Sequence, residues 1–360
     1  MYFMKIYIVI MAVCLSLIPA KYSLAGFDYN IRLLTYGLLQ EPADSLRNPG
    51  NTVFQISQNI AVTELRPDFS FAYNKMDISV KPRLRYQWER LEIAGSSESK
   101  KAGELFVNEW LARFMASDRV FLSCGRENLQ WGPGWLSSPS NPFFYYNGRL
   151  NPLLEVPGKD FARIVYLPDM MWTVSLIANF AKGRSEIQPG KDFEKTYALK
   201  TDYTGEAAFG GVIFSHSEGG ESNAGAFGGW TVSNATLLYG DLNVSTEDKT
   251  ALLSGISYTL ESGPTFALEY SYRENNPDSL SHHTVMLQYY QNEICNRIDL
   301  LLRGTSNIND DSIQFVANVD YIAGDHSQLF LNTIVNSGSD TGEFGRFFDY
   351  QVMAGFEYSF

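Results

Sequence analysis

The sequence predicts an all-β fold, an antiparallel transmembrane β-barrel of about 18 strands with both termini on the periplasmic side. Three observations support this prediction. The N-terminus has the features of an export signal, an alternation of apolar and polar residues recurs along the chain, and short turns alternate with longer polar connections.

The N-terminal segment predicts a cleaved signal peptide over residues 1–25. Lys5 precedes a run dominated by apolar residues over 6–18, which Pro19 and the small-residue pattern at 23–25 follow. An uncleaved membrane anchor is the alternative, but the run falls short of the roughly 20 residues that a spanning helix needs. We therefore expect cleavage after Ala25 and one barrel domain over residues 26–360.

The composition of the mature chain excludes some partners. Residues 1–25 contain Lys5 and Lys21 and no acid, so removing them leaves 26 basic and 40 acidic residues, a net charge of −14. This charge disfavours a nucleic-acid partner. Only Cys124 and Cys295 remain after cleavage, which is too few to indicate a disulfide framework. Aromatic residues reach 14% of the chain, as the interfacial girdles of a membrane barrel require.

Strand-like alternation is clearest at the C-terminus. Over residues 348–360 every second residue, from Phe348 to Phe360, is apolar or aromatic, and most of the intervening residues are polar. Similar alternation occurs over 78–89, 266–273 and 313–321. Period-two alternation indicates strands with one apolar face. A β-sandwich would bury that face against a second sheet, whereas a barrel turns it towards lipid.

The connections between these strands favour the barrel. Short turns near 74, 117, 168, 204, 233, 262, 292 and 324 alternate with longer polar segments. The longer segments cover residues 41–51, 93–103, 131–158, 182–192, 217–223, 246–249, 274–282, 305–311 and 337–345. Counting between them gives about 18 strands, and 16 is the alternative if a hairpin is miscounted.

The chain ends on an aromatic pattern of its own. Phe356, Tyr358 and Phe360 stand at alternate positions and close the sequence. This resembles the C-terminal β-signal of outer-membrane proteins, which implies recognition by the barrel assembly machinery. The resemblance adds the outer membrane as the expected location and its lipid as a partner.

The connection over residues 131–158 is the longest in the sequence. Its Pro and Gly residues prevent regular strand pairing, and its aromatic content argues against disorder. It either caps the barrel rim or folds into the lumen and narrows it. The candidate constriction residues are Trp131, Trp135, Asn141, Phe143 and Tyr145.

The start of this connection resembles porin-like barrels related to alginate export and capsule assembly. The matching residues are Gly125-Arg126, the Trp-Gly-Pro-Gly stretch 131–134 and Asn141-Pro142. The resemblance covers some thirty residues and implies the barrel class without a substrate. No single characterised family matches the rest of the chain.

One strand predicts the charge of the lumen wall. Lys81, Arg83 and Arg85 alternate with apolar residues, and a cation on the lipid side costs roughly 2 to 4 kcal/mol. The cations must point inward, where they form a basic ladder; Arg126 and Glu127 are further pore-lining candidates. Alternatively, inward carboxylates such as Glu127, Glu269 and Asp320 neutralise these cations. If the ladder is open to solutes, Arg83→Glu should shift the selectivity towards cations.

Enzyme chemistry finds no support in the sequence. The four histidines, at 216, 282, 283 and 326, form no recognisable catalytic or metal-binding motif. We expect no catalytic activity, cofactor or metal.

The first functional hypothesis is a porin-like channel for small hydrophilic solutes with a preference for anions. The second is a non-conducting barrel that binds, or helps to assemble or export, a surface polysaccharide or envelope partner. Both leave the oligomeric state open.

Overall fold

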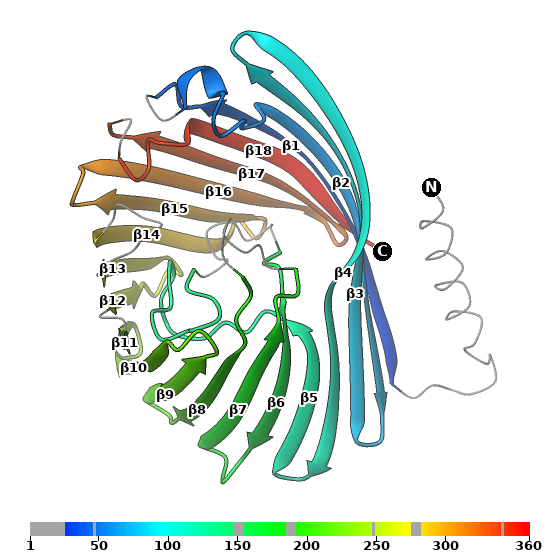
Figure 1. Ribbon diagram of the computed structural model, residues 1–360, viewed down its shortest axis with the longest axis vertical. Coiled ribbons are helices and arrows are strands. Elements are labelled where there is room, and N and C mark those ends of the chain that lie inside the picture. The colour runs from blue at the N-terminus through cyan, green and yellow to red at the C-terminus, as the bar shows by residue number, and fades with distance from the viewer. Residues whose placement is uncertain are drawn as a thin grey trace, which may run out of the picture.

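The computed structural model describes residues 26–45, 48–146, 155–184, 192–246, 249–274, 282–339 and 342–360 (Figure 1). The predicted signal peptide lies outside the described residues. Within these residues the chain forms 18 strands and one short 3-10 helix, η1 (Pro49–Asn51). No helix in this part of the chain is long and apolar enough to cross a membrane.

The strands run through the whole described chain. In order they are β1 (Phe27–Pro42), β2 (Asn59–Tyr73), β3 (Met76–Ile93), β4 (Ser96–Ser117), β5 (Val120–Glu127), β6 (Lys159–Tyr166), β7 (Trp172–Ala181), β8 (Thr196–Thr204), β9 (Ala208–Ser217), β10 (Ser222–Ser233), β11 (Thr236–Ser245), β12 (Thr250–Thr259), β13 (Thr265–Arg273), β14 (His283–Ile294), β15 (Ile298–Asn307), β16 (Ser312–Gly324), β17 (Ser327–Ser337) and β18 (Phe348–Ser359).

These strands form one closed antiparallel sheet. Each strand pairs with the next along the chain, and β1 pairs with both β2 and β18. The predicted count of 18 is confirmed, and the alternatives of 16 strands and of a two-sheet sandwich are wrong. Because the number of strands is even, the start of β1 and the end of β18 lie at the same end of the barrel. That this end faces the periplasm stays a prediction.

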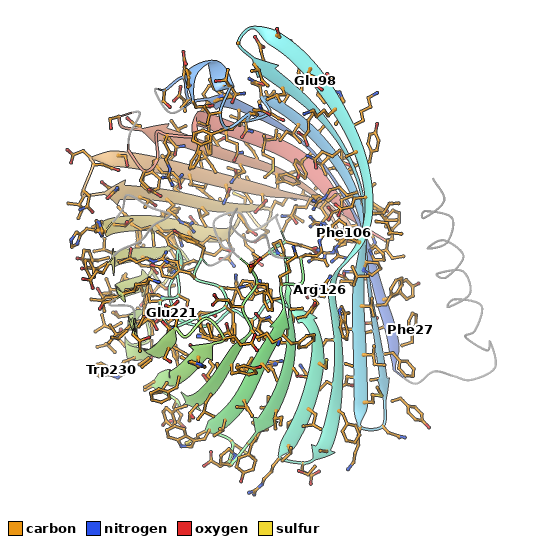
Figure 2. The ribbon with its side chains drawn as sticks, in the orientation of Figure 1. Phe27, Glu98, Phe106, Arg126, Glu221 and Trp230 are labelled. Carbon is orange, nitrogen blue, oxygen red and sulfur yellow. The ribbon has the colours of Figure 1, made fainter. Side chains whose placement is uncertain are left out.

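The side chains alternate between an apolar outer face and a mainly polar inner face. On β3, Leu84 and Tyr86 are each at least half exposed, whereas Arg83 next to Leu84 is fully buried. The same register recurs around the ring, where Phe27 and Trp230 lie on the outside (Figure 2). An outer face with this many exposed apolar side chains suits lipid and is poorly suited to water.

The β3–β4 hairpin departs from the sequence prediction. Residues 93–103 were expected to form a long connection, but β3 continues to Ile93 and β4 begins at Ser96. The turn consists of Ala94 and Gly95, both in the left-handed region with φ of 48° and 80°. Two such residues match the right-handed twist of a tight hairpin. The expectation failed because residues 96–103 are polar or small on both faces, as befits strands that extend beyond the rim of the ring (Figure 1).

A hydrophobic core lies inside the ring of strands. It joins Phe143 and Phe144 of the connection between β5 and β6 to inward residues of the wall, among them Phe161, Ile177 and Ile213. The Phe143 and Phe161 rings meet edge to face with centroids 4.9 Å apart. Part of the lumen is therefore filled by contacting hydrophobic side chains.

Candidate functional site

The connection between β5 and β6 enters the barrel (Figure 1). We call residues 128–158 the inward loop; residues 147–154 within it lie outside the described residues. Of the two placements that the sequence left open, the described parts of the loop take the lumen and not the rim. Their contacts with the inner wall show how the loop is held.

Two buried wall carboxylates fasten the first part of the loop. Asp241 on β11 accepts hydrogen bonds from the Ser138 hydroxyl at 2.9 Å and from the Ser140 amide at 2.7 Å. Glu269 on β13 accepts one from the Trp135 amide at 2.7 Å. Both carboxylates are only 2% exposed. Amide and hydroxyl donors are strong partners for buried carboxylates, so this part of the loop is firmly attached to the wall.

The Trp-Gly motif is explained by the same contact. Gly132 has a φ of 89°, in the left-handed region, and a β-carbon there would lie 2.6 Å from the Asp241 carboxylate and 2.4 Å from the Ser138 hydroxyl. A residue with a side chain would be both strained and obstructed. Gly132 thus allows the loop backbone to approach Asp241.

The remaining loop candidates have structural contacts of their own. The Asn141 carboxamide accepts hydrogen bonds from the backbone amides of Phe143 and Phe144. It also donates one to the Leu129 carbonyl, which connects residues 141–144 to the start of the loop. Trp131 meets Phe143 edge to face at 5.8 Å. Of the predicted constriction residues, Trp131 and Phe143 therefore belong to the hydrophobic core, and Asn141 to the fold of the loop.

Glu155 fastens the far arm of the loop to the opposite wall. Its carboxylate receives two hydrogen bonds from Arg83 on β3, at 2.8 and 2.6 Å. Asp68 on β2 also contacts Arg83, with 2.8 Å between Nη2 and Oδ1. A bidentate guanidinium–carboxylate pair is strong and directional. The described loop thus spans from β11 and β13 to β3.

Arg83 also donates hydrogen bonds where the backbone pairing of β2 with β3 is interrupted. The pairing of β2 with β3 is interrupted between Leu65–Leu84 and Phe69–Val80, where Pro67 and Pro82 fall. Since proline has no amide hydrogen, a regular ladder is lost there. The Arg83 Nη1 donates to the carbonyls of Pro67 and Pro82 at 3.0 and 2.8 Å. With these bonds and those to Glu155, Arg83 has no exposed surface.

The positive charges of Lys81, Arg83 and Arg85 on β3 are largely neutralised by carboxylates. Lys81 pairs with Glu109 at 2.5 Å and Arg85 pairs with Glu64 at 2.5 Å, while Arg83 pairs as described. The cations point inward as the sequence predicts, and each has a carboxylate partner, as in the alternative that the sequence left open. The partners are not Glu127, Glu269 or Asp320, which lie on other strands. Lys81 and Arg85 keep about a third of their side chains exposed, at 38% and 32%.

The other two pore-lining candidates form ion pairs on β5 and β6. Arg126 Nε lies 2.7 Å from Asp160, and Glu127 lies 3.1 Å from Arg163. Arg126 also donates to the Val107 carbonyl at 3.2 Å. Arg126 and Glu127 are consecutive residues of β5 and point to opposite faces of the sheet. Arg126 is paired across the strands with Trp110, which is paired with the outward Val80, so Glu127 lines the inner wall and Arg126 does not.

Sequence reasoning missed the anchors of the loop. Asp241 carried no signal beyond being a carboxylate on an inward strand position, and Glu269 was expected to pair with cations instead of loop amides. Both lie more than 100 residues from their partners. Asp68, Glu155 and Lys159, whose Nζ donates to the Phe143 carbonyl at 2.6 Å, were also missed.

The Glu155 anchor predicts a dependence on pH. Burial favours the neutral acid, but the hydrogen bonds and charge of Arg83 outweigh it and hold the pKa of Glu155 below its ordinary 4.5. A carboxyl whose pKa is lowered by folding contributes stability above its unfolded pKa and loses it as pH falls through the folded value. The anchor is thus complete above about pH 4.5 and weakens only in stronger acid.

We expect the current noise of the protein in a planar bilayer to rise as the pH falls below about 4.5, because the far arm detaches from Arg83. Glu155→Gln should be noisy already at pH 7 and respond less to acid. Glu104→Gln, at an exposed residue of β4, is the control and should behave like wild type. Acid noise that is the same in Glu155→Gln and wild type would contradict this assignment.

A closed barrel with an apolar outer face, a charged inner wall and a long loop fastened inside defines the porin-type class of fold. No protein-family model and no curated protein matches the chain. Solved structures do. The structure of Pseudomonas aeruginosa OccK7 (OpdD) matches with a TM-score of 0.65 and 9% identity, covering 93% of this chain and 99% of that one. The outer membrane protein OprD from the same organism gives 0.60 and 8%, covering 94% and 96%.

A third neighbour was solved with a small molecule. Pseudomonas aeruginosa OpdK with vanillate matches with a TM-score of 0.61 and 12% identity, covering 93% of this chain and 98% of that chain. At these identities the likeness concerns the fold. It extends over nearly the whole length of both chains and agrees with the closed 18-stranded sheet.

Proposed function

We propose that the protein is an outer-membrane channel for small hydrophilic solutes, with a preference for anions. The observation that carries the proposal is the lumen: a barrel of 18 strands is wide enough for water, and a fastened loop narrows it. The apolar outer face supports placement in a membrane. The neighbours include an outer membrane protein and a barrel solved with vanillate, an aromatic carboxylate.

The preference for anions rests on cations that remain partly exposed on the β3–β6 wall. Lys81, Arg113 and Arg163 lie on the inward face in the sheet register, and Arg113 is the most exposed of them. Selectivity depends on such local charges because charges beyond about 8 to 10 Å are screened at physiological salt. The mature charge of −14 expected from the sequence therefore does not oppose an anion preference.

Conductance and reversal potential in a planar bilayer test the proposal. We expect discrete channels whose reversal potential in a KCl gradient shows anion preference. Lys81→Gln should reduce the anion-to-cation permeability ratio by up to roughly fivefold, because a unit charge about 8 Å from an ion in water is worth about 0.5 kcal/mol, with opposite sign for an anion and a cation. Lys81→Gln tests the wall charge alone, whereas Arg83→Glu would also break the contact between Arg83 and Glu155 that fastens the loop.

Lys100→Gln is the matched control, since Lys100 is exposed on the β3–β4 hairpin. It should leave the permeability ratio unchanged. Persistent electrical silence of the wild type would overturn the channel and favour the binding or assembly barrel. A cation-selective wild type that Lys81→Gln does not alter would overturn the anion preference alone.

A further inference from the structure

A polar cavity of about 270 Å³ lies between the inward loop and the loop-side ends of β9 to β13. Pockets for drug-sized ligands usually measure about 300 to 1,000 Å³, so this one has room for a single small molecule. The polar side chains and the aromatic ring that matter to it are Tyr145, Glu221, Asn223, Asn243, Lys249 and Arg273. None of them was singled out by sequence except Tyr145.

Tyr145 and Arg273 form one side of this cavity. The guanidinium of Arg273 lies over the Tyr145 ring, 4.0 Å from its centroid. Burial raises the pKa of Tyr145 to about 12, so the ring stays neutral. Stacking holds the guanidinium flat and leaves the N–H groups at its edge directed outward. Among the described residues, none pairs with this guanidinium or accepts a hydrogen bond from it.

Glu221 and two amides form the other side. Glu221 accepts a hydrogen bond from the Ser245 hydroxyl at 2.9 Å and lies 3.8 Å from the Lys249 ammonium. Asn243 donates to Asn223 at 3.3 Å, which uses one polar atom of each amide. The other polar atoms, Oδ1 of Asn243 and Nδ2 of Asn223, have no hydrogen-bond partner in the part of the chain that the structure describes. The cavity therefore offers both donors and acceptors.

We propose that this cavity is a binding site for an uncharged polyhydroxylated solute of the size of one monosaccharide. A hydroxyl group both donates and accepts, so a polyol can donate to Glu221 and Asn243 Oδ1 and accept from Arg273. A simple carboxylate only accepts hydrogen bonds, so it could not donate to Glu221 or to Asn243 Oδ1, and the charge of Glu221 would repel it. The site thus takes a class of solute other than the anions for which the wall is proposed to select.

Equilibrium binding to the purified full-length protein in detergent tests the site without requiring conduction. The probes are methyl α-D-glucopyranoside, sodium D-glucuronate and sodium acetate, followed by saturation-transfer NMR. We expect the glucoside to bind and acetate not to compete with it. Glu221→Gln and Asn243→Ala should each weaken glucoside binding, the first by about tenfold, as expected for a hydrogen bond to a charged group.

Glu98→Gln is the matched control, because Glu98 lies on the exposed β3–β4 hairpin, far along the ring from Glu221 (Figure 2). It should bind the glucoside like wild type. Heat-modifiable migration checks that every variant is folded. The site is overturned if glucuronate or acetate binds and the glucoside does not, or if both pocket variants bind the glucoside like wild type. Neither result bears on the conductance, so the channel proposal is judged separately.

Discussion

Replacing Asp241 with alanine is expected to release the inward loop from β11 and to raise the single-channel conductance. The carboxylate receives two hydrogen bonds from the loop, from Ser138 and Ser140, and bonds to charged acceptors contribute about 1.5 to 3 kcal/mol each. Their loss also leaves a loop amide unpaired in a buried place. We expect a larger mean conductance with frequent excursions, and the Asp241→Ala/Glu269→Ala double variant should exceed the single one.

Asp320→Ala is the control for this prediction, because Asp320 is an inward carboxylate on β16, whereas the loop anchors described here lie on β3, β11 and β13. It should leave the conductance and its noise unchanged. Chymotrypsin provides a second readout, since a released loop exposes Trp131, Phe143 and Tyr145 to cleavage. Wild-type conductance combined with protease resistance in the double variant would show that these carboxylates do not hold the loop.

The loop marks the limit of what the sequence can predict. Proline, glycine and aromatic content distinguished residues 131–158 from the other connections, and this reasoning found the correct segment. Its position in the lumen depends on Asp241 and Glu269, which lie more than 100 residues from the loop residues that they bind. Nothing in local alternation indicates that two particular inward carboxylates meet two particular loop amides, because both are ordinary polar residues until the barrel closes.

The strands were more predictable because their pattern has a single cause. Outward positions must be apolar wherever lipid is the neighbour, so the period of two appears along each strand and the count of 18 follows. Where both faces of a strand meet water, the constraint disappears. That is the case over residues 96–103, and there the sequence prediction of a loop was wrong.

The charges of the wall show an intermediate case. Alternation placed Lys81, Arg83 and Arg85 correctly on the inner face. It could not identify their partners, since these lie on β2, on β4 and in the inward loop. Pro67 and Pro82 were visible in the sequence, but their meeting across β2 and β3 was not. The role of Arg83 at this interruption of the pairing therefore emerges only from the sheet register.

Phe360→Ser is expected to lower severely the amount of folded barrel in the outer membrane. The Phe360 amide donates to the Ile31 carbonyl at 2.9 Å, and its ring meets Tyr358 edge to face at 5.0 Å. Phe360 is 65% exposed. Since β18 closes the sheet against β1, the end of β18 is the seam of the barrel. A serine keeps the amide bond and removes only the aromatic group, so the loss would report on recognition of the terminal aromatic and not on sheet pairing.

Tyr29→Ser separates that effect from the general loss of an apolar surface. Tyr29 lies near the start of β1, also has an exposed ring at 60%, and is remote from the chain terminus in sequence. If the terminal aromatic acts as an assembly signal, Tyr29→Ser should insert almost normally while Phe360→Ser accumulates unfolded in the periplasm. Fractionation and heat-modifiable migration measure both. Equal losses in the two variants would assign the defect to the aromatic belt, and normal levels of Phe360→Ser would refute the signal, because the seam would then close without the terminal ring.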